Sequence, residues 1–132
     1  MKNHSNFVND ILGNHLIVDL YQCDKDIINN IELIKIIIHD TIDQIGAKLI
    51  SEGYKEFSPI GISAFAIISE SHISIHTWPE YEFAAVDIFS CNRQLTSDIC
   101  EYIQMKLYAK QIKTKLISRG KKQYINHFEG EK

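Results

Sequence analysis

Residues 61–90 read GISAFAIISESHISIHTWPEYEFAAVDIFS, and this stretch predicts three β-strands separated by short breaks. The strands are GISAFAIIS, SHISIHTW and FAAVDIFS. In the first strand both alternating sets of side chains are apolar, which is typical of a sheet that is covered on both faces. The centre of the fold is therefore expected to be a sheet with a layer on each side.

Outside this stretch we expect strands at 15–22 and 54–57, a helix from Asp26 to about Ser51, a second helix from Thr96 or Ser97 to about Lys110, and a last strand at 111–118. Apolar residues at helical intervals predict the first helix, which should end between Gly46 and Gly53. The strand at 54–57 should stop at Ser58 and Pro59, because proline cannot donate a hydrogen bond to a sheet.

These elements predict an α+β fold, a two-layer sandwich of a mainly antiparallel sheet with two helices on one face. A chain of 132 residues that is 45% hydrophobic fits a single domain, 1–132, with one core. Two helices can cover only one face, and the other face would expose a larger apolar patch than soluble monomers usually tolerate. We therefore expect a homodimer in which the uncovered faces of two sheets pack together.

Charge and composition exclude several classes of protein. A net charge of -3 argues against a nucleic-acid-binding protein, which normally carries a basic excess. The start of the chain lacks the plan of a secretory signal, and the apolar stretch at 31–38 is broken by charged residues, so we expect a cytoplasmic protein without a membrane segment. Three cysteines without CxxC spacing suit neither a disulfide framework nor a zinc site.

Hydroxyl, imidazole, carboxylate and thiol groups are concentrated in the segment from Ser69 to Cys91. His72 and His76 could ligate a metal, but two imidazoles without a third ligand are a weak motif. Ser71, His76 and Asp87 could form a hydrolase triad, although no GxSxG elbow is present. Cys91 could pair with His76 as a thiol nucleophile, or it could be a small core residue. The residue types alone leave these alternatives open.

The segments FSPIGIS (57–63), ISESHISIHTWPEY (68–81) and AAVDIFSC (84–91) together resemble the short prokaryotic S-adenosylmethionine decarboxylases. The resemblance extends through YQCD (21–24) and covers most of the chain. It implies decarboxylation of S-adenosylmethionine to the aminopropyl donor of spermidine biosynthesis. The alternatives are a pyruvoyl-dependent arginine or ornithine decarboxylase of the same fold and an uncleaved regulatory subunit.

The resemblance further implies a proenzyme that cleaves itself between Glu70 and Ser71. Residues 1–70 would become the β chain and residues 71–132 the α chain. Ser71 would become a covalent pyruvoyl group, the only cofactor implied, and no metal is expected. This carbonyl would form a Schiff base with the substrate amine and act as an electron sink when carbon dioxide leaves.

Four side chains carry the chemistry that the resemblance implies. Ser71 attacks the preceding carbonyl, Ser63 assists through a hydrogen bond, and His76 removes the proton from the Ser71 Cα. Histidine suits this task because imidazole gains and loses protons near neutral pH. Cys91 protonates the substrate after decarboxylation, a role that fits a thiol because thiols are mostly protonated at neutral pH.

Substrate binding is implied for Phe57, which corresponds to the adenine-stacking position, and for Glu80, which corresponds to the carboxylate that binds the ribose. Trp78 lies beside them as a contact or as packing. An aromatic face attracts a cation such as a sulfonium by about 0.5–2 kcal/mol. Because Pro79 makes this region a turn, Glu80 could equally be a solvated turn residue.

The chain departs from the usual family pattern at four positions. Ala64 and Glu82 stand where the family usually has glycine, and Glu82 is expected to add charge near the mouth of the site. Lys55 and Glu56 replace the usual histidine before the aromatic residue. These departures affect the expected substrate preference more than the cofactor.

Five residues separate Ser71 from His76, so on a straight strand their side chains face opposite sides. The two residues can cooperate only if the backbone bends near Glu70 to His72. We therefore expect such a bend, and a regular strand through 70–76 in the mature enzyme would count against the mechanism.

Overall fold

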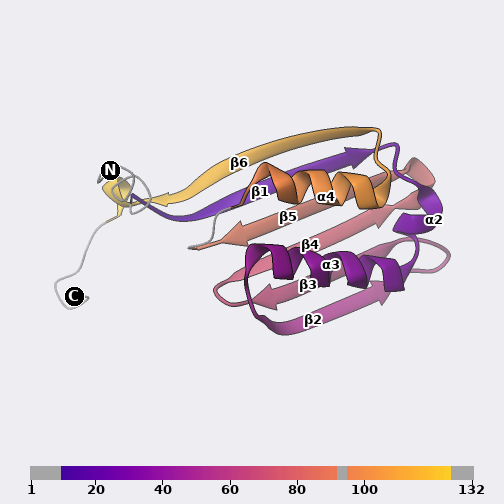
Figure 1. The fold of residues 1–132 in the computed structure, drawn as a ribbon, viewed down its shortest axis with the longest axis horizontal. Helices are drawn as coiled ribbons and strands as arrows, with labels where there is room; N and C mark the ends of the chain where they lie inside the picture. Colours follow the sequence, from indigo (N-terminus) through magenta and orange to yellow (C-terminus); the bar gives the residue numbers. More distant parts are fainter. Residues whose placement is uncertain (1–9, 92–94, 126–132) are drawn as a thin grey trace.

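A computed structural model describes residues 10–91 and 95–125, which form one six-stranded sheet with helices on one face (Figure 1). The elements are β1 (Ile11–Tyr21), α2 (Lys25–Ile28), α3 (Ile31–Ile45), β2 (Leu49–Glu56), β3 (Ile62–Ile68), β4 (Ser71–Trp78), η1 (Pro79–Tyr81), β5 (Phe83–Ser90), α4 (Ser97–Leu107), β6 (Gln111–Lys121) and η2 (Lys122–Tyr124). The strand order is β2-β3-β4-β5-β1-β6, and every neighbouring pair is antiparallel.

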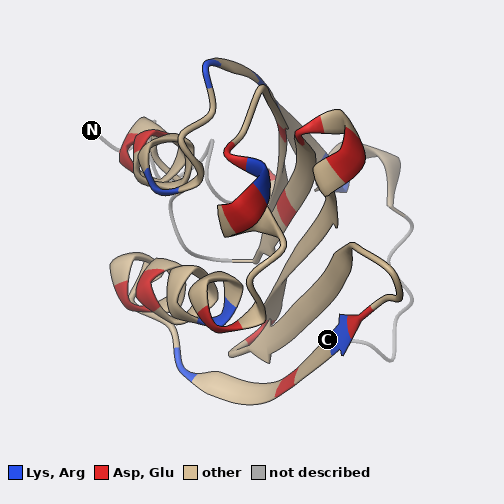
Figure 2. Cartoon of the chain, turned by 90° about the vertical axis from the view of Figure 1, so that its right-hand side faces the viewer, with Lys and Arg blue, Asp and Glu red and all other residues tan. Residues whose placement is uncertain are grey.

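The covered face of the sheet holds the core. Strands alternate between buried and more exposed residues, as in β5, where every second residue from Ala84 to Ser90 is buried. The buried residues of α3 and α4 pack on this side, and Figure 2 shows that both helices also carry acidic and basic residues. The expected fold class, an antiparallel sheet with helices on one face, is confirmed.

The expected helix from Asp26 to about Ser51 is divided in the structure. The Asn30 side chain accepts hydrogen bonds from the Glu32 and Leu33 amides, which caps the start of α3 and separates it from α2. Three helices therefore cover the sheet instead of two. Helical spacing alone missed this break because Ile27 and Ile31 keep the same period across it.

The same helix ends at Gly46, the early limit of the expected range. Gly46 adopts φ 77°, the left-handed conformation that glycine favours at the C-terminus of a helix, and its amide bonds to the Ile42 and Asp43 carbonyls. Strand β2 then begins at Leu49, which pairs with Ile68. The expected strand at 54–57 is thus only the second half of a longer one.

The uncovered face of the sheet carries exposed apolar side chains. Phe65, Ile67 and Trp78 are 44%, 46% and 41% exposed, and all three belong to the sets that point away from the helices. Both alternating sets of β3 are therefore apolar for different reasons, since one set packs under the helices and the other forms this surface. Among the described residues, no helix has the length and apolar character needed to cross a membrane.

Candidate active site

The junction between Glu70 and Ser71 lies at the turn between β3 and β4. Glu70 has φ 61°, a left-handed conformation that is uncommon for residues other than glycine. The chain reverses here, and Ser71 opens β4 as a regular strand, paired with Ile68 on one side and Ser90 on the other. The bend expected near 70–72 thus lies before Ser71, and residues 71–78 run straight.

The Ser71 hydroxyl is held in an unusual state. Its Oγ is buried and has no hydrogen-bond partner among the described residues. A buried polar atom without a partner costs about 1–3 kcal/mol, so native structures seldom keep one without a reason. An unpaired hydroxyl next to a carbonyl in a strained turn is an arrangement suited to attack on that carbonyl.

Cys91 lies close to this junction. It directly follows Ser90, which pairs with Ser71 across β4 and β5, and its side chain is exposed. Ser71 and Cys91 therefore lie at the same end of the sheet. We call the group of Glu70, Ser71 and Cys91 the junction group.

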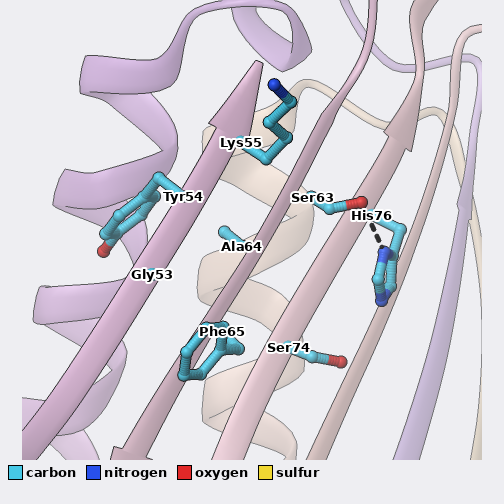
Figure 3. A pocket seen from close by; sticks show the side chains of 8 residues that line it. All are labelled: Gly53, Tyr54, Lys55, Ser63, Ala64, Phe65, Ser74 and His76. Carbon is cyan, nitrogen blue, oxygen red and sulfur yellow. Dashed lines mark hydrogen bonds between the residues drawn. The ribbon is translucent and has the colours of Figure 1, made fainter. Parts of the chain in front are cut away.

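Ser63 and His76 lie at the other end of β4. They are paired residues of β3 and β4, and the Ser63 Oγ lies 2.9 Å from the His76 Nδ1 in a hydrogen bond (Figure 3). Both side chains point to the uncovered face. We call these two residues the imidazole group.

The structure separates the junction group from the imidazole group within one chain. Ser71 and His76 are five residues apart on a regular strand, which spans about 16 Å at the usual rise, and their side chains face opposite sides of the sheet. The expectation that a bend brings them together in one chain is wrong. For the same reason Ser71, His76 and Asp87 form no triad, and Cys91 does not pair with His76.

The residues expected to bind substrate gather around the imidazole group. A hollow of about 240 Å³ is lined by nine residues, which include all three of the expected substrate-binding residues: Phe57, Ile60, Gly61, Ile62, Ser63, His76, Thr77, Trp78 and Glu80. A second hollow of about 380 Å³, drawn in Figure 3, shares Ser63 and His76 with the first and extends along β2 and β3 past Phe65. The imidazole group thus stands where the two hollows meet.

Trp78 is both a wall of the first hollow and part of an aromatic row. Its ring centroid lies 5.5 Å from that of Phe83 and 6.5 Å from that of His76, and Phe83 in turn lies 5.1 Å from Tyr21. The row fixes one wall of the hollow. Glu80 reaches the hollow from η1, the turn that Pro79 begins.

The four departures from the family pattern have different structural settings. Ala64 is 3% exposed and packs in the core on the helix side. Glu82 has φ 54°, which accounts for the usual glycine, and it lines a separate hollow with Cys23 instead of the one around His76. Lys55 lines the hollow of Figure 3, and Glu56 is exposed.

A cluster of polar side chains on the uncovered face was missed as a unit by sequence reasoning. The Asp87 carboxylate accepts hydrogen bonds from Ser74, from the His72 Nε2 at 3.0 Å and from the His15 Nε2 at 2.6 Å. The Arg119 Nη1 donates to the His15 Nδ1 at 2.9 Å. Four strands are thereby joined, and we call these five residues the Asp87 network.

Hydrogen bonding sets the charge state of this network. Burial raises the pKa of the Asp87 carboxyl, but the bonds from Ser74, His15 and His72 outweigh it and hold the pKa below the ordinary value of an aspartate. Because arginine can only donate, the His15 Nδ1 must accept, and the ring proton of His15 is on Nε2, facing Asp87.

The ligand atoms of His15, His72 and Asp87 lie within 4.8 Å of one another, close enough for a metal ion. The Arg119 cation against His15 disfavours a metal there, and hydrogen bonds already satisfy the carboxylate. His76 lies away from this cluster, so the possible His72–His76 metal pair is not formed. His15 and Arg119 are polar residues whose side chains point to the uncovered face. The pairing of β1 with β6 is needed to see that they lie together.

Comparison with known proteins adds the family. The sequence profile described as S-adenosylmethionine decarboxylase matches residues 14–120. The S-adenosylmethionine decarboxylase proenzyme of Caldicellulosiruptor saccharolyticus is 43% identical over 110 residues, which cover 83% of this chain and 89% of that protein. The proenzyme of Clostridium kluyveri is also 43% identical over 110 residues, covering 83% and 87% of the two chains.

Solved structures agree with these relatives. The crystal structure of the adenosylmethionine decarboxylase from Aquifex aeolicus matches with a TM-score of 0.75 and 33% identity, covering 84% of this chain and 92% of that one. A Trypanosoma brucei AdoMetDC monomer, 15% identical with a TM-score of 0.58, shares the fold. By the extent of the profile match and the identity to its relatives, the chain belongs to the S-adenosylmethionine decarboxylase family.

Proposed function

We propose that this chain cleaves itself between Glu70 and Ser71 and then decarboxylates S-adenosylmethionine. The observation that carries the proposal is the buried Ser71 Oγ without a hydrogen-bond partner among the described residues, next to a left-handed Glu70. Family membership supports the same reaction, because the named relatives are S-adenosylmethionine decarboxylase proenzymes.

The cleavage proceeds in three balanced steps. The Ser71 Oγ bonds to the Glu70 carbonyl carbon, the peptide C–N bond breaks, and the nitrogen of residue 71 takes the hydroxyl proton. A base then removes the Ser71 Cα proton, and the Cα–H electron pair expels the Glu70 carboxylate, which leaves dehydroalanine. Water adds and ammonia leaves, so that residue 71 ends as a pyruvoyl group. The products are a β chain, 1–70, and an α chain, 71–132.

The residues at the junction fit a pyruvoyl group. A chain that must present a reactive hydroxyl to the preceding carbonyl needs that hydroxyl unengaged, and the Ser71 Oγ has no hydrogen-bond partner within residues 10–91 and 95–125. The pyruvoyl carbonyl supplies an electron sink for the bond that breaks at the substrate α-carbon. Cys91, exposed and one residue beyond the Ser71 partner, is the proton donor at this end of the sheet.

His76 is the proposed base, and it must come from a second copy of the chain. Within one chain it lies about 16 Å along β4 from Ser71, on the other face. Two uncovered faces packed together with their strands reversed end for end would place the imidazole group of one copy over the end of the partner's sheet that carries the junction group, on the backbone side of Ser71 opposite to its hydroxyl. A two-fold axis that runs across the strands, between the sheets, gives this arrangement.

The exposed apolar side chains on the uncovered face support such a homodimer. Phe65, Ile67 and Trp78 are each more than two-fifths exposed in the single chain, and a second sheet would cover them. Each complete site would then contain the junction group of one copy and the imidazole group, with both hollows, of its partner.

The hollow beside His76 supports S-adenosylmethionine as the substrate. Phe57 is half exposed and offers a face on which adenine can stack, Glu80 offers a carboxylate to ribose hydroxyls, and Trp78 offers a face to the sulfonium. Arginine and ornithine have neither an adenine ring nor a ribose. Decarboxylation of these amino acids would leave Phe57 and Glu80 without a role.

Carbon dioxide release from labelled substrates tests the proposed activity. Purified protein is incubated in parallel with S-adenosylmethionine, arginine and ornithine, and the Ser71→Ala variant is the control. We expect release from S-adenosylmethionine alone, and none from the control. Release from arginine or ornithine in preference to S-adenosylmethionine would overturn the proposed substrate.

A further inference from the structure

Cleavage would remove the covalent connection that holds the start of β4. The turn at Ser69 and Glu70 no longer continues into the strand, and a chain terminus frays unless contacts hold it. Conversion of Ser71 also removes its nitrogen, so the first backbone N–H of the new chain belongs to His72. The pyruvoyl group must nevertheless stay beside Cys91.

His72 has the first side chain of the new chain, and it is firmly attached to β5. Its Nε2 lies 3.0 Å from the Asp87 Oδ2, and its ring stacks on Phe89 with 6.1 Å between centroids and 16° between planes. Asp87 and Phe89 precede Cys91 by four and two residues on the same strand. His72 therefore ties the start of β4 to the strand that leads to the proposed proton donor.

The attachment is itself held from both sides. Asp87 takes a second hydrogen bond from β4, through Ser74, at its other carboxylate oxygen. His15, on β1, donates to the carboxylate, and Arg119, on β6, donates to His15. Gly13 allows the Phe89 ring to lie across β1, because a Cβ there would stand 2.6 Å from that ring.

We propose that His72 is a positioning residue, which acts through Asp87 and Phe89 to hold the pyruvoyl-bearing terminus in place after cleavage. This inference rests on the proposed self-cleavage before Ser71. Before cleavage the continuous backbone holds the same strand, so the contact becomes essential only afterwards. Loss of His72 should therefore spare the cut and impair the reaction that follows it.

The test compares His72→Ala with His39→Ala. His39 is a matched control, because its Nε2 pairs with the Glu52 carboxylate at 2.7 Å and it belongs to neither the junction group nor the Asp87 network. Intact mass measures cleavage, and carbon dioxide release from S-adenosylmethionine gives kcat and KM separately. We expect both variants to cleave. His72→Ala should lose about 10- to 100-fold in kcat with a smaller change in KM, the size typical of a misplaced reacting group, while His39→Ala keeps both constants.

Amide hydrogen exchange provides a second readout, in case altered kcat reflects a folding defect. In cleaved protein, His72→Ala should speed exchange at residues 72–74 by about tenfold or more, as for loss of a hydrogen bond to a charged group. In an uncleavable Ser71→Ala background the same substitution should change this exchange little. His72→Gln, whose amide can still donate to Asp87, should restore part of the kcat.

Two results would overturn the inference. One is wild-type kcat and exchange in cleaved His72→Ala protein. The other is failure of His72→Ala to cleave while it folds normally, because His72 would then serve the cut instead of the later step. Absence of cleavage in the wild-type protein would instead contradict the proposed function itself.

Discussion

Ser71 and His76 belong to the same regular strand, β4, yet their side chains face opposite sides of the sheet and stand five residues apart. The Ser71 Oγ is buried without a partner among the described residues, whereas His76 is exposed and hydrogen-bonded to Ser63. If His76 is the base for the proposed cleavage, the two residues must belong to different copies of the chain.

This relationship predicts complementation between two inactive variants. Ser71→Ala lacks the nucleophile but keeps His76, and His76→Ala lacks the base but keeps Ser71. Alone, each variant should stay uncut. When the two are expressed together with different tags, mixed dimers should form, and intact mass should detect fragments only from the His76→Ala chain.

The mixture is informative only if mixed dimers are recovered by sequential capture on both tags. Recovered mixed dimers without any cleaved His76→Ala chain would contradict catalysis between copies. So would His76→Ala protein that cuts itself at the wild-type rate.

The three cysteines should differ in reactivity. Burial and the nearby Glu82 carboxylate raise the pKa of the Cys23 thiol to about 11, and burial raises the pKa of the Cys100 thiol, whereas Cys91 is exposed. A maleimide at pH 7.5 should therefore modify Cys91 first, as peptide mapping can show. Because general acids contribute about 100-fold or more, decarboxylation should fall by that factor.

The Cys100→Ser variant is the control for this labelling. It should lose activity at the same rate as the wild-type protein when treated with the reagent. Full activity in protein whose Cys91 is modified would exclude Cys91 as the proton donor.

Two residues that line the hollow beside His76, Phe57 and Glu80, should each contribute to the KM for S-adenosylmethionine. Phe57→Ala removes the stacking face, and Glu80→Gln removes the charge of the carboxylate. Each should raise KM for S-adenosylmethionine by about tenfold, since stacking on an aromatic ring and a hydrogen bond to a charged group are each worth about 1–3 kcal/mol.

Both variants should still cleave, because neither side chain belongs to the junction group. Met105→Ala is a suitable control, since Met105 is an exposed residue of α4, on the opposite side of the sheet from both hollows. Unchanged KM in both Phe57→Ala and Glu80→Gln would place adenosine elsewhere.

The Asp87 network predicts a dependence of stability on acid. Because the folded-state pKa of Asp87 is lowered, its stabilising contribution is present above the unfolded-state pKa and is lost as the pH falls through the folded-state pKa. In a Ser71→Ala background, which keeps the chain intact, Asp87→Asn should lower the free energy of unfolding at pH 6. The difference should shrink below about pH 4.

Urea unfolding at several pH values measures this difference. Ile17→Ala is the control, because Ile17 pairs with Asp87 in the sheet and has no ionisable group. The loss of unfolding free energy that Ile17→Ala causes should stay constant over the same pH range. An Asp87→Asn cost that does not change with pH would show that the network does not depend on the charge of Asp87.

Much of the fold follows from local patterns in the sequence. The patterns in residues 61–90 predicted β3, β4 and β5, and the later helix, α4, begins near the expected Thr96. The break at Asn30 was missed, because the apolar period runs through it and only side-chain capping interrupts it, whereas the end at Gly46 lies at the early limit of the expected range.

The site shows the limit of sequence reasoning more clearly. The motif match predicted that Ser71 and His76 act in the same reaction. Only the structure shows that β4 runs straight between them, so that their side chains face opposite sides of the sheet. His15 and Arg119 stand 104 residues apart in the sequence, and only the pairing of β1 with β6 brings them together. Such contacts depend on register between distant strands, which local periodicity does not contain.

The central claim is that the unpaired Ser71 hydroxyl cuts the bond that precedes it. A time course of intact mass on freshly purified protein tests this claim most directly, with Ser71→Ala as the uncut control. We predict two fragments, 1–70 with a free carboxyl end and 71–132 with a pyruvoyl group in place of Ser71. A wild-type chain that stays whole after prolonged incubation, or a cut at another bond, would contradict the account.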